Sequence, residues 1–429
     1  TGRAVAASIG MAKGKSNTKK TILLGMDTRI SSDMLASALT AGILSVGYDV
    51  INLGVVPTPA VAYLTRRYKA RAGIMISASH NPFEFNGIKV FNAAGFKLAD
   101  ELEENIESMV LGEVPMPKPA TGAKIGKIIH KPEAIDEYIK FVASTTTERL
   151  DGLTVAFDCA NGSSSRTAEK LFTSLGVNCV MLSDKPDGTN INDNCGSTHM
   201  EGLMKFVKEN SFDVGLAFDG DADRVLAVDE NGEYVDGDKI MAICALDMRE
   251  RGLLSDNTVV ATVMSNLGFF IMGKEKNLEI KRTKVGDRYV LEEMLKCGHH
   301  IGGEQSGHVI LIDHNTTGDG LVTGLQLLSV LKRSGKKLSE LASVMQVYPQ
   351  VLINAKVKNE YKNEESYMAF PEIKEKIKSI EDEFSDSGRV LIRPSGTEPL
   401  VRIMIEGKGE KLIKKRAEEL AAIMEEKLN

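Results

Sequence analysis

The sequence contains no long apolar run. No stretch approaches the roughly 18 consecutive apolar residues that a membrane-spanning helix requires, and the start has no apolar core of a secretory signal. Low-complexity tracts are absent as well. We therefore expect no membrane association.

Cysteine is scarce. The five cysteines are odd in number and scattered, and none forms a C-x-x-C pair: Cys159, Cys179, Cys195, Cys244 and Cys297. This pattern argues against a disulfide framework and against a thiolate metal site, and it is typical of a reducing compartment. We expect a cytoplasmic protein.

The sequence also lacks an excess of positive charge. It has 53 Lys and Arg against 59 Asp and Glu, which gives a net charge of −6. A nucleic-acid binder normally shows a basic excess, so no nucleic-acid partner is expected. What is present is a chain of 429 residues with 42% hydrophobic content, enough for several domains with real cores.

Three segments of the chain are similar to one another. They read TILLGMDTRISS from Thr21, LTVAFDCANGSSS from Leu153 and NTVVATVMSNLGF from Asn257. Each is a short apolar strand, then a polar or glycine turn, then a helix start with small residues. Strands that alternate with amphipathic helices are typical of βαβ units. The sequence therefore predicts three related α/β domains with mixed, mostly parallel sheets.

The pattern changes after Gly335. VLINAKVKN alternates like a half-exposed strand, Lys358–Ile380 reads as one charged helix, GRVLIRP and LVRIMIEG read as a hairpin, and a last helix begins near Lys411. These elements predict a small C-terminal α+β domain. Residues 111–132, rich in proline and glycine, predict a turn-rich excursion near the end of the first domain. We expect domain boundaries that give residues 1–150, 151–252, 253–346 and 347–429.

Ser79 lies in a turn that Asn81-Pro82 closes, just beyond a predicted buried strand, Gly73–Ser77. α/β sheets hold ligands at the carboxyl ends of their strands. A serine hydroxyl is a weak nucleophile until a base or metal assists it, so a phosphate carrier and a turn-capping serine both remain open. His80 suits a packing role better than a base, and Lys89 is a candidate counter-ion for phosphate.

Three alternating carboxylates follow the apolar run VGLAF: Asp219, Asp221 and Asp223. Carboxylates this close repel one another unless a cation holds them, and their hard oxygens suit Mg²⁺ or Ca²⁺. A calcium EF-hand is rejected because Arg224 replaces the required glycine and strands flank the loop. An aspartyl-phosphate enzyme would show Gly-Thr after Asp-x-Asp. A structural carboxylate loop is the remaining alternative to a Mg²⁺ site.

Two further motifs could bind a phosphorylated sugar. GGEQSGH offers Glu304, Ser306 and His308, and TKVGDR just upstream adds Lys284, Asp287 and Arg288. RPSGTEPLVR offers an anion cradle from Arg393, Ser395, Gly396 and Thr397. A glycine turn with a capping serine is the alternative for the first motif, and a plain hairpin turn is the alternative for the second.

The four motifs together, in this order, resemble the α-D-phosphohexomutase superfamily over nearly the whole chain. Within it the resemblance is closest to the phosphoglucosamine mutases, on the cues SASHNP, Gln305 and INDNCGSTH at Ile191–His199. The resemblance implies three α/β domains and a C-terminal domain around a central active-site cleft. It also implies domain motion at the Gly335–Val351 junction.

The resemblance implies a role for each motif. Ser79 would carry a phosphoryl group and, with Asp219, Asp221 and Asp223, bind one Mg²⁺ per chain. Lys89 and His308 would transfer protons. The substrate would be bound by Glu304, Ser306, Lys284, Asp287 and Arg224, and its non-reacting phosphate by Arg393, Ser395, Gly396 and Thr397.

The implied reaction interconverts glucosamine 6-phosphate and glucosamine 1-phosphate, with a sugar 1,6-bisphosphate as intermediate and activator. The expected partner is a small hexosamine phosphate, and the expected assembly is a monomer or homodimer. A phosphoglucomutase or phosphomannomutase, or a non-catalytic sugar-phosphate sensor, are the alternatives. Two departures stand out. The N-terminal strand of such proteins is expected to precede Thr1, and Met26 stands where relatives commonly have arginine, although Arg29 remains.

Overall fold

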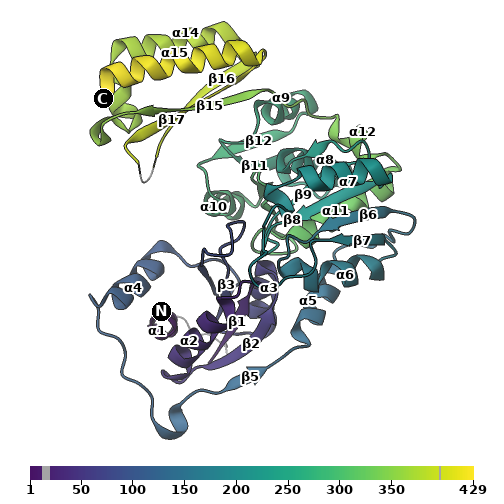
Figure 1. The fold of residues 1–429 in the computed structure, drawn as a ribbon, viewed down its shortest axis with the longest axis vertical. Coiled ribbons are helices and arrows are strands. Elements are labelled where there is room, and N and C mark those ends of the chain that lie inside the picture. Colours follow the sequence, from purple (N-terminus) through teal and green to yellow (C-terminus); the bar gives the residue numbers. More distant parts are fainter. Residues whose placement is uncertain (12–19, 396–397) are drawn as a thin grey trace. The chain divides into compact units, whose positions relative to one another are not determined.

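A computed structural model describes residues 1–11, 20–395 and 398–429 of the chain (Figure 1). The chain divides into two compact units. The first consists of Thr1–Met264 and Glu279–Val344, and the second consists of Ser265–Leu278 and Met345–Asn429. The described helices include none that is both long enough and apolar enough to cross a membrane, and all five cysteines carry free thiols.

The first unit contains three sheets. The first sheet, in the order β4-β3-β1-β2-β5, consists of β1 (Thr21–Met26), β2 (Asp49–Val55), β3 (Ala72–Ile76), β4 (Ile88–Asn92) and β5 (Ile128–His130). The second, in the order β10-β9-β8-β6-β7, consists of β6 (Thr154–Asp158), β7 (Asn178–Leu182), β8 (Val214–Phe218), β9 (Val225–Asp229) and β10 (Tyr234–Val235). The third, in the order β12-β11-β13-β14, consists of β11 (Thr258–Thr262), β12 (Glu279–Thr283), β13 (Ile301–Gly303) and β14 (Val309–Leu311).

The three sheets share one topology. In each, the opening strand lies between two parallel partners: β1 between β2 and β3, β6 between β7 and β8, and β11 between β12 and β13. The third strand of each set then pairs antiparallel with the fourth. The opening strands are the three segments that look alike in sequence. The predicted three related α/β domains with mixed, mostly parallel sheets are therefore confirmed.

The first unit also contains helices, most of which pack against these sheets or against one another. They are α1 (Gly2–Met11), α2 (Ser32–Leu44), α3 (Thr58–Arg67), α4 (Asp100–Leu111), α5 (Ala134–Ala143), α6 (Ala168–Ser174), α7 (Glu201–Asn210), α8 (Gly237–Glu250), α10 (Asp287–Cys297), α11 (Gly320–Ser334) and α12 (Leu338–Ala342). Every residue of β3, β8 and β9 is buried. Continuous apolar runs of this kind form strands that are covered on both faces.

The second unit has a three-stranded antiparallel sheet in the order β15-β17-β16. Its elements are α9 (Leu267–Lys276), β15 (Gln350–Lys356), α13 (Glu364–Met368), α14 (Pro371–Phe384), β16 (Gly388–Pro394), β17 (Leu400–Gly407) and α15 (Glu410–Leu428). Helices α14 and α15 cover one face of the sheet (Figure 1). The predicted α+β domain, its hairpin and its last helix are confirmed.

One predicted element of this unit is wrong. The charged segment Lys358–Ile380 is not a single helix, because α13 ends at Met368 and α14 begins at Pro371. Proline has no N–H to donate and its ring clashes with the preceding turn, so it is tolerated only in the first turn of a helix. The side chain of Asn363 caps the start of α13 by accepting the N–H of Ser366 at 2.8 Å. Strand β5, within the turn-rich excursion, was not predicted either.

Candidate active site

Ser79 lies in the turn that follows β3, and its backbone is strained. Its φ is +54°, in the left-handed region that few residues other than glycine adopt, at a typical cost of about 1–3 kcal/mol. Its N–H donates to the hydroxyl of Ser77 at 2.9 Å. Its own hydroxyl donates to a carboxylate oxygen of Asp219 at 2.6 Å. The hydroxyl is therefore directed at the aspartates and does not cap its own turn.

The three aspartates lie between β8 and β9, the two strands predicted on either side of them. Oxygens of Asp219, Asp221 and Asp223 lie within 4.8 Å of one another, and all three residues are buried. Burial, together with the charges of Asp223 and Asp221, raises the pKa of Asp219 well above its usual range. One oxygen each of Asp221 and Asp223 is buried without a hydrogen-bond partner in the described part of the chain. This oxygen-only donor set fits a hard divalent cation such as Mg²⁺.

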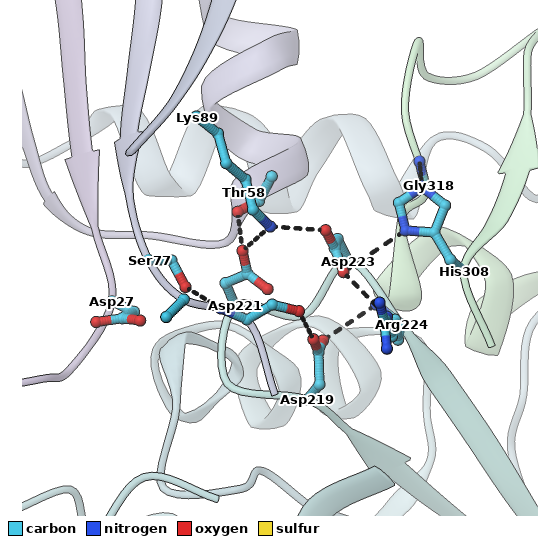
Figure 2. A network of polar contacts seen from close by, with 12 residues as sticks. Asp27, Thr58, Ser77, Lys89, Asp219, Asp221, Asp223, Arg224, His308 and Gly318 are labelled. Atoms are coloured by element: carbon cyan, nitrogen blue, oxygen red, sulfur yellow. Dashed lines mark hydrogen bonds and ion pairs between the residues drawn. The ribbon is translucent and has the colours of Figure 1, made fainter. Parts of the chain in front are cut away.

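Lys89, on β4, reaches the same cluster. Its Nζ lies 2.6 Å from Asp221 and 3.0 Å from Asp223 (Figure 2). Burial by itself would lower the pKa of Lys89, but the charges of Asp221 and Asp223 outweigh it and hold the pKa above its usual range. Lys89 is thus protonated. His80 differs from it, because burial lowers the pKa of its imidazole.

His308 is buried on the other side of Asp223. Its Nδ1 lies 3.6 Å from a carboxylate oxygen of Asp223, and its Nε2 accepts the N–H of Gly318 at 3.1 Å. A ring nitrogen that accepts a hydrogen bond carries no proton, which leaves Nδ1 to hold the proton of the imidazole. Asp287 is 3.4 Å from Nε2 and pairs with Lys97 at 2.5 Å. Burial would raise the pKa of Asp287, but the neighbouring His308 and the ammonium of Lys97 lower it.

Two buried donors near this cluster have no hydrogen-bond partner among the residues described here. They are the hydroxyl of Ser306 and the Nε of Arg224. Burial would lower the pKa of Arg224, but the charges of Asp219, Asp223 and Glu304 raise it, so the guanidinium keeps its charge. Unpaired buried donors are costly unless a ligand meets them. This observation favours an anionic or hydroxyl-bearing ligand at the loop after β13.

The other predicted residues of the third sheet have protein contacts. A carboxylate oxygen of Glu304 accepts the N–H of Gly286 at 3.2 Å. The side-chain amide of Gln305 donates to Asp236 at 3.1 Å. The ammonium of Lys284 lies 5.8 Å from the ring centre of Tyr289.

The predicted phosphate cradle belongs to the second unit. Arg393, near the end of β16, lies directly across from Arg402 on β17. Burial and the charge of Arg402 lower the pKa of Arg393. Like charges placed opposite each other on neighbouring strands are destabilising, and an anion between them would remove the repulsion. Ser395 accepts the N–H of Glu398 at 3.3 Å. Gly396 and Thr397 lie outside the described residues.

Sequence reasoning assigned no site role to four residues that complete the serine and aspartate loops. Arg29 donates to the carbonyls of Ser79, Asn81 and Pro82 and pairs with Asp27 at 2.9 Å. The side chain of Asn192 donates to two of the same carbonyls, and the hydroxyl of Thr58 donates to Asp221. Asp27 and Arg29 follow β1, which runs parallel to β3, so a shared sheet edge was the available signal. Asn192 lies within INDNCGSTH, a motif that served only as a cue to the family, and Thr58 carried no local signal.

Comparisons with known proteins agree with this architecture. The phosphoglucomutase/phosphomannomutase alpha/beta/alpha domains I, II and III match residues 1–114, 136–232 and 236–348, and the C-terminal domain of that family matches residues 352–423. The boundaries predicted from composition, at residues 150, 252 and 346, stay predictions. Among curated relatives, phosphoglucosamine mutase from Acetivibrio thermocellus is 60% identical over 96% of this chain and 92% of its own length. The Ruminiclostridium cellulolyticum phosphoglucosamine mutase is 58% identical over 97% and 92%.

Solved structures share the fold at lower identity. A phosphoglucomutase/phosphomannomutase family protein from Burkholderia thailandensis is 22% identical, with a TM-score of 0.79 over 100% of this chain and 94% of its own. The N-acetylphosphoglucosamine mutase from Aspergillus fumigatus, solved with GlcNAc-6P and magnesium, is 19% identical, with a TM-score of 0.68 over 86% and 92%.

Proposed function

Because the chain belongs to the phosphoglucosamine mutase family, we propose that it interconverts glucosamine 6-phosphate and glucosamine 1-phosphate, a reaction of amino-sugar metabolism. One observation carries the proposal: a strained serine directs its hydroxyl at a buried cluster of three carboxylates, 2.6 Å from Asp219. A turn with a purely structural role does not require a serine hydroxyl directed at buried carboxylates. An enzyme that carries a phosphoryl group on Ser79 does require it, because the metal ligands must lie beside the carrier.

The carboxylates fit one Mg²⁺ per chain. Asp219, Asp221 and Asp223 would hold it, and the phosphoryl oxygens on Ser79 would supply a further ligand. The oxygens of Asp221 and Asp223 that lack a partner in the described chain support this assignment. When bound, the ion supplies positive charge that neutralises phosphoryl oxygens during transfer.

Lys89, His308 and Arg224 are assigned to the reacting end of the substrate. When the phosphoryl group passes from Ser79 to a sugar hydroxyl, the P–O bond to the serine breaks and a P–O bond to the sugar forms. The sugar hydroxyl gives up a proton and the serine oxygen takes one. Lys89, which is protonated beside the cluster, is assigned to donate a proton to the serine oxygen. His308 is assigned to accept the proton of the sugar hydroxyl on its unprotonated Nε2, in exchange for the hydrogen bond from the Gly318 N–H. Arg224, which keeps its positive charge, is assigned to stabilise the negative charge on the phosphoryl oxygens during transfer.

The remaining residues are assigned to substrate recognition. Glu304 and Ser306 would contact the sugar, with Lys284 and Asp287 nearby in sequence. In the second unit Arg393, Ser395, Gly396 and Thr397 would hold the phosphate that does not react. A cradle that recognises phosphate and not the carbon bearing it serves a sugar 1,6-bisphosphate in both orientations. That bisphosphate is the proposed intermediate and activator. A cytoplasmic location and a monomeric or homodimeric state stay predictions.

The test follows glucosamine 6-phosphate by phosphorus NMR with the protein, Mg²⁺ and a trace of sugar bisphosphate, beside a parallel sample of glucose 6-phosphate. The proposal expects a 1-phosphate signal that rises faster from the amino sugar. Faster conversion of glucose 6-phosphate would contradict the proposed preference and indicate a phosphoglucomutase. No conversion in either sample, with sugar-phosphate binding retained, would indicate a non-catalytic sensor and refute the proposal.

A further inference from the structure

The turn that carries Ser79 is held by its backbone carbonyls. The guanidinium of Arg29 donates to the carbonyl of Ser79 at 3.2 Å, to that of Asn81 at 2.8 Å, and to that of Pro82. Its side chain is fully buried, and so is that of its charge partner, Asp27. Arginine presents several donors in a rigid planar fork, which a lysine cannot reproduce. One buried side chain thus holds three carbonyls of the turn.

A second residue holds the same turn from the second sheet's side. The side-chain amide of Asn192, in the loop after β7, donates to the carbonyl of Ser79 at 2.9 Å and to that of Asn81 at 3.0 Å. Gly220, between two of the aspartates, leaves room for this contact. A Cβ at that position would lie 2.7 Å from the Ser79 carbonyl and 2.9 Å from the Asn192 amide.

Two physical consequences follow. A left-handed serine persists only where its surroundings over-determine it, and these donors supply that restraint at the Ser79 carbonyl and at the carbonyls of Asn81 and Pro82 further along the turn. Relaxation of the turn would move the Ser79 hydroxyl away from Asp219. The donors also engage the carbonyl oxygens of the turn, whose negative ends would otherwise repel the oxygens of a phosphoryl group.

We propose that Arg29 and Asn192 are positioning residues for phosphoryl transfer, which hold the Ser79 turn by its carbonyls so that the hydroxyl stays aimed at the aspartate cluster. The proposal rests on the mutase activity proposed above. Neither residue touches the reacting atoms. Their effect is therefore on the rate of transfer and not on the affinity for the sugar phosphate.

The variants are Asn192→Ala and Arg29→Lys, and the matched control is Asn194→Ala. Asn194 lies in the same loop and shares the left-handed backbone, with φ of +51° against +58° for Asn192, but among the residues that the structure describes its amide donates only to the neighbouring Asp193. Steady-state kinetics with glucosamine 6-phosphate give the first readout. Hydrogen–deuterium exchange of residues 77–86 gives a second, which needs no activity.

Both variants are expected to lose about 10²-fold in kcat, with KM within about twofold of wild type, and to exchange faster across residues 77–86. Asn194→Ala should match wild type in all three. A rise in KM at unchanged kcat, or full activity of Arg29→Lys, would overturn the proposal, as would unchanged exchange in Asn192→Ala. If Arg29→Lys fails to fold, Asn192→Ala decides the question. An inactive wild type would refute the mutase function alone, and exchange would still test the restraint on the turn.

Discussion

At the scale of single residues, Ser79 carries the heaviest assignment. Ser79→Ala removes the phosphoryl carrier while leaving the turn and its restraints in place, because alanine and serine meet similar strain at positive φ. We expect turnover to fall by at least roughly 10³-fold, with sugar-phosphate binding retained. Initial rates by phosphorus NMR, binding by calorimetry and phosphoserine content by intact mass provide the measurements.

The matched control is Ser37→Ala. Ser37 is exposed on α2, and its hydroxyl donates to the carbonyl one turn earlier, at Asp33. This variant should keep wild-type activity and phosphoserine content. Full activity of Ser79→Ala would rule out Ser79 as the carrier.

Residue types revealed part of this site and not the rest. Ser79, Lys89 and the aspartates were found because nucleophile, cation and metal-ligand types stand in recognisable motifs, and the structure brings all of them together. The role of Arg29 and Asn192 was missed because both side chains bind backbone carbonyls. Because every residue has a backbone carbonyl, the residue types of the serine motif do not indicate which side chains will bind its carbonyls.

At the scale of elements, the hairpin of β8 and β9 depends on a small residue at its tip. Gly220→Ala would place a Cβ 2.7 Å from the Ser79 carbonyl and 2.7 Å from the side chain of Ile191. Overpacking of this kind typically destabilises by about 1–3 kcal/mol, and it would displace the serine turn. We expect a lower melting temperature together with a loss of turnover, measured by thermal unfolding and initial rates.

The control is Gly202→Ala in α7, where an added Cβ meets nothing within 4 Å. Alanine favours a helix over glycine by roughly 0.5–1 kcal/mol, so this variant should be unchanged or slightly more stable. Wild-type behaviour of Gly220→Ala would show that the tip tolerates a methyl group.

The start of α11 gives a pH-dependent prediction. Asp319 caps this helix by accepting the N–H of Val322, and it also accepts the hydroxyl of Tyr138. Burial raises the pKa of its carboxyl above the ordinary value of 3.8 despite these hydrogen bonds. The folded protein therefore binds more protons than the unfolded chain between the two pKa values. The stability that Asp319 contributes is present below about pH 3.8 and is lost as the pH rises through the folded pKa.

Asp319→Asn cannot titrate, so the stability of wild type relative to this variant should fall as the pH rises from about 4 to 7. Melting temperatures over that range provide the measurement. Asp187→Asn is the control, because Asp187 has a shift of opposite sign. Hydrogen bonds from Thr189 lower the pKa of exposed Asp187 below the ordinary value of 3.8, so its contribution is lost only as the pH falls below about 4, and this variant should show little change relative to wild type between pH 4 and 7. A constant difference for Asp319→Asn would contradict the raised pKa.

At the scale of the whole molecule, the sequence predicted the order and kind of domains better than their details. The threefold repeat was visible because each unit must open on a buried strand followed by a tight turn, and the shared topology confirms it. The break before Pro371 was a local signal that the charge pattern concealed. The inclusion of α9 in the second unit had no local signal. The start of α9 is linked to the rest of the second unit by the side-chain amide of Asn266, which donates to the Tyr348 carbonyl at 3.0 Å.

The last prediction concerns the second unit, whose proposed task is to bind the phosphate that does not react. Arg393 faces Arg402 across the hairpin, a repulsion that a bound phosphate would relieve. Arg393→Ala removes a charged hydrogen bond of about 1.5–3 kcal/mol, so KM should rise roughly tenfold or more, with a smaller effect on kcat. Arg416→Ala, in the same unit, is the control, because its partners Glu383 and Glu419 form partly exposed ion pairs on the helices that typically contribute little. The measurement is steady-state kinetics of both variants. An unchanged KM for Arg393→Ala would show that Arg393 does not bind the non-reacting phosphate.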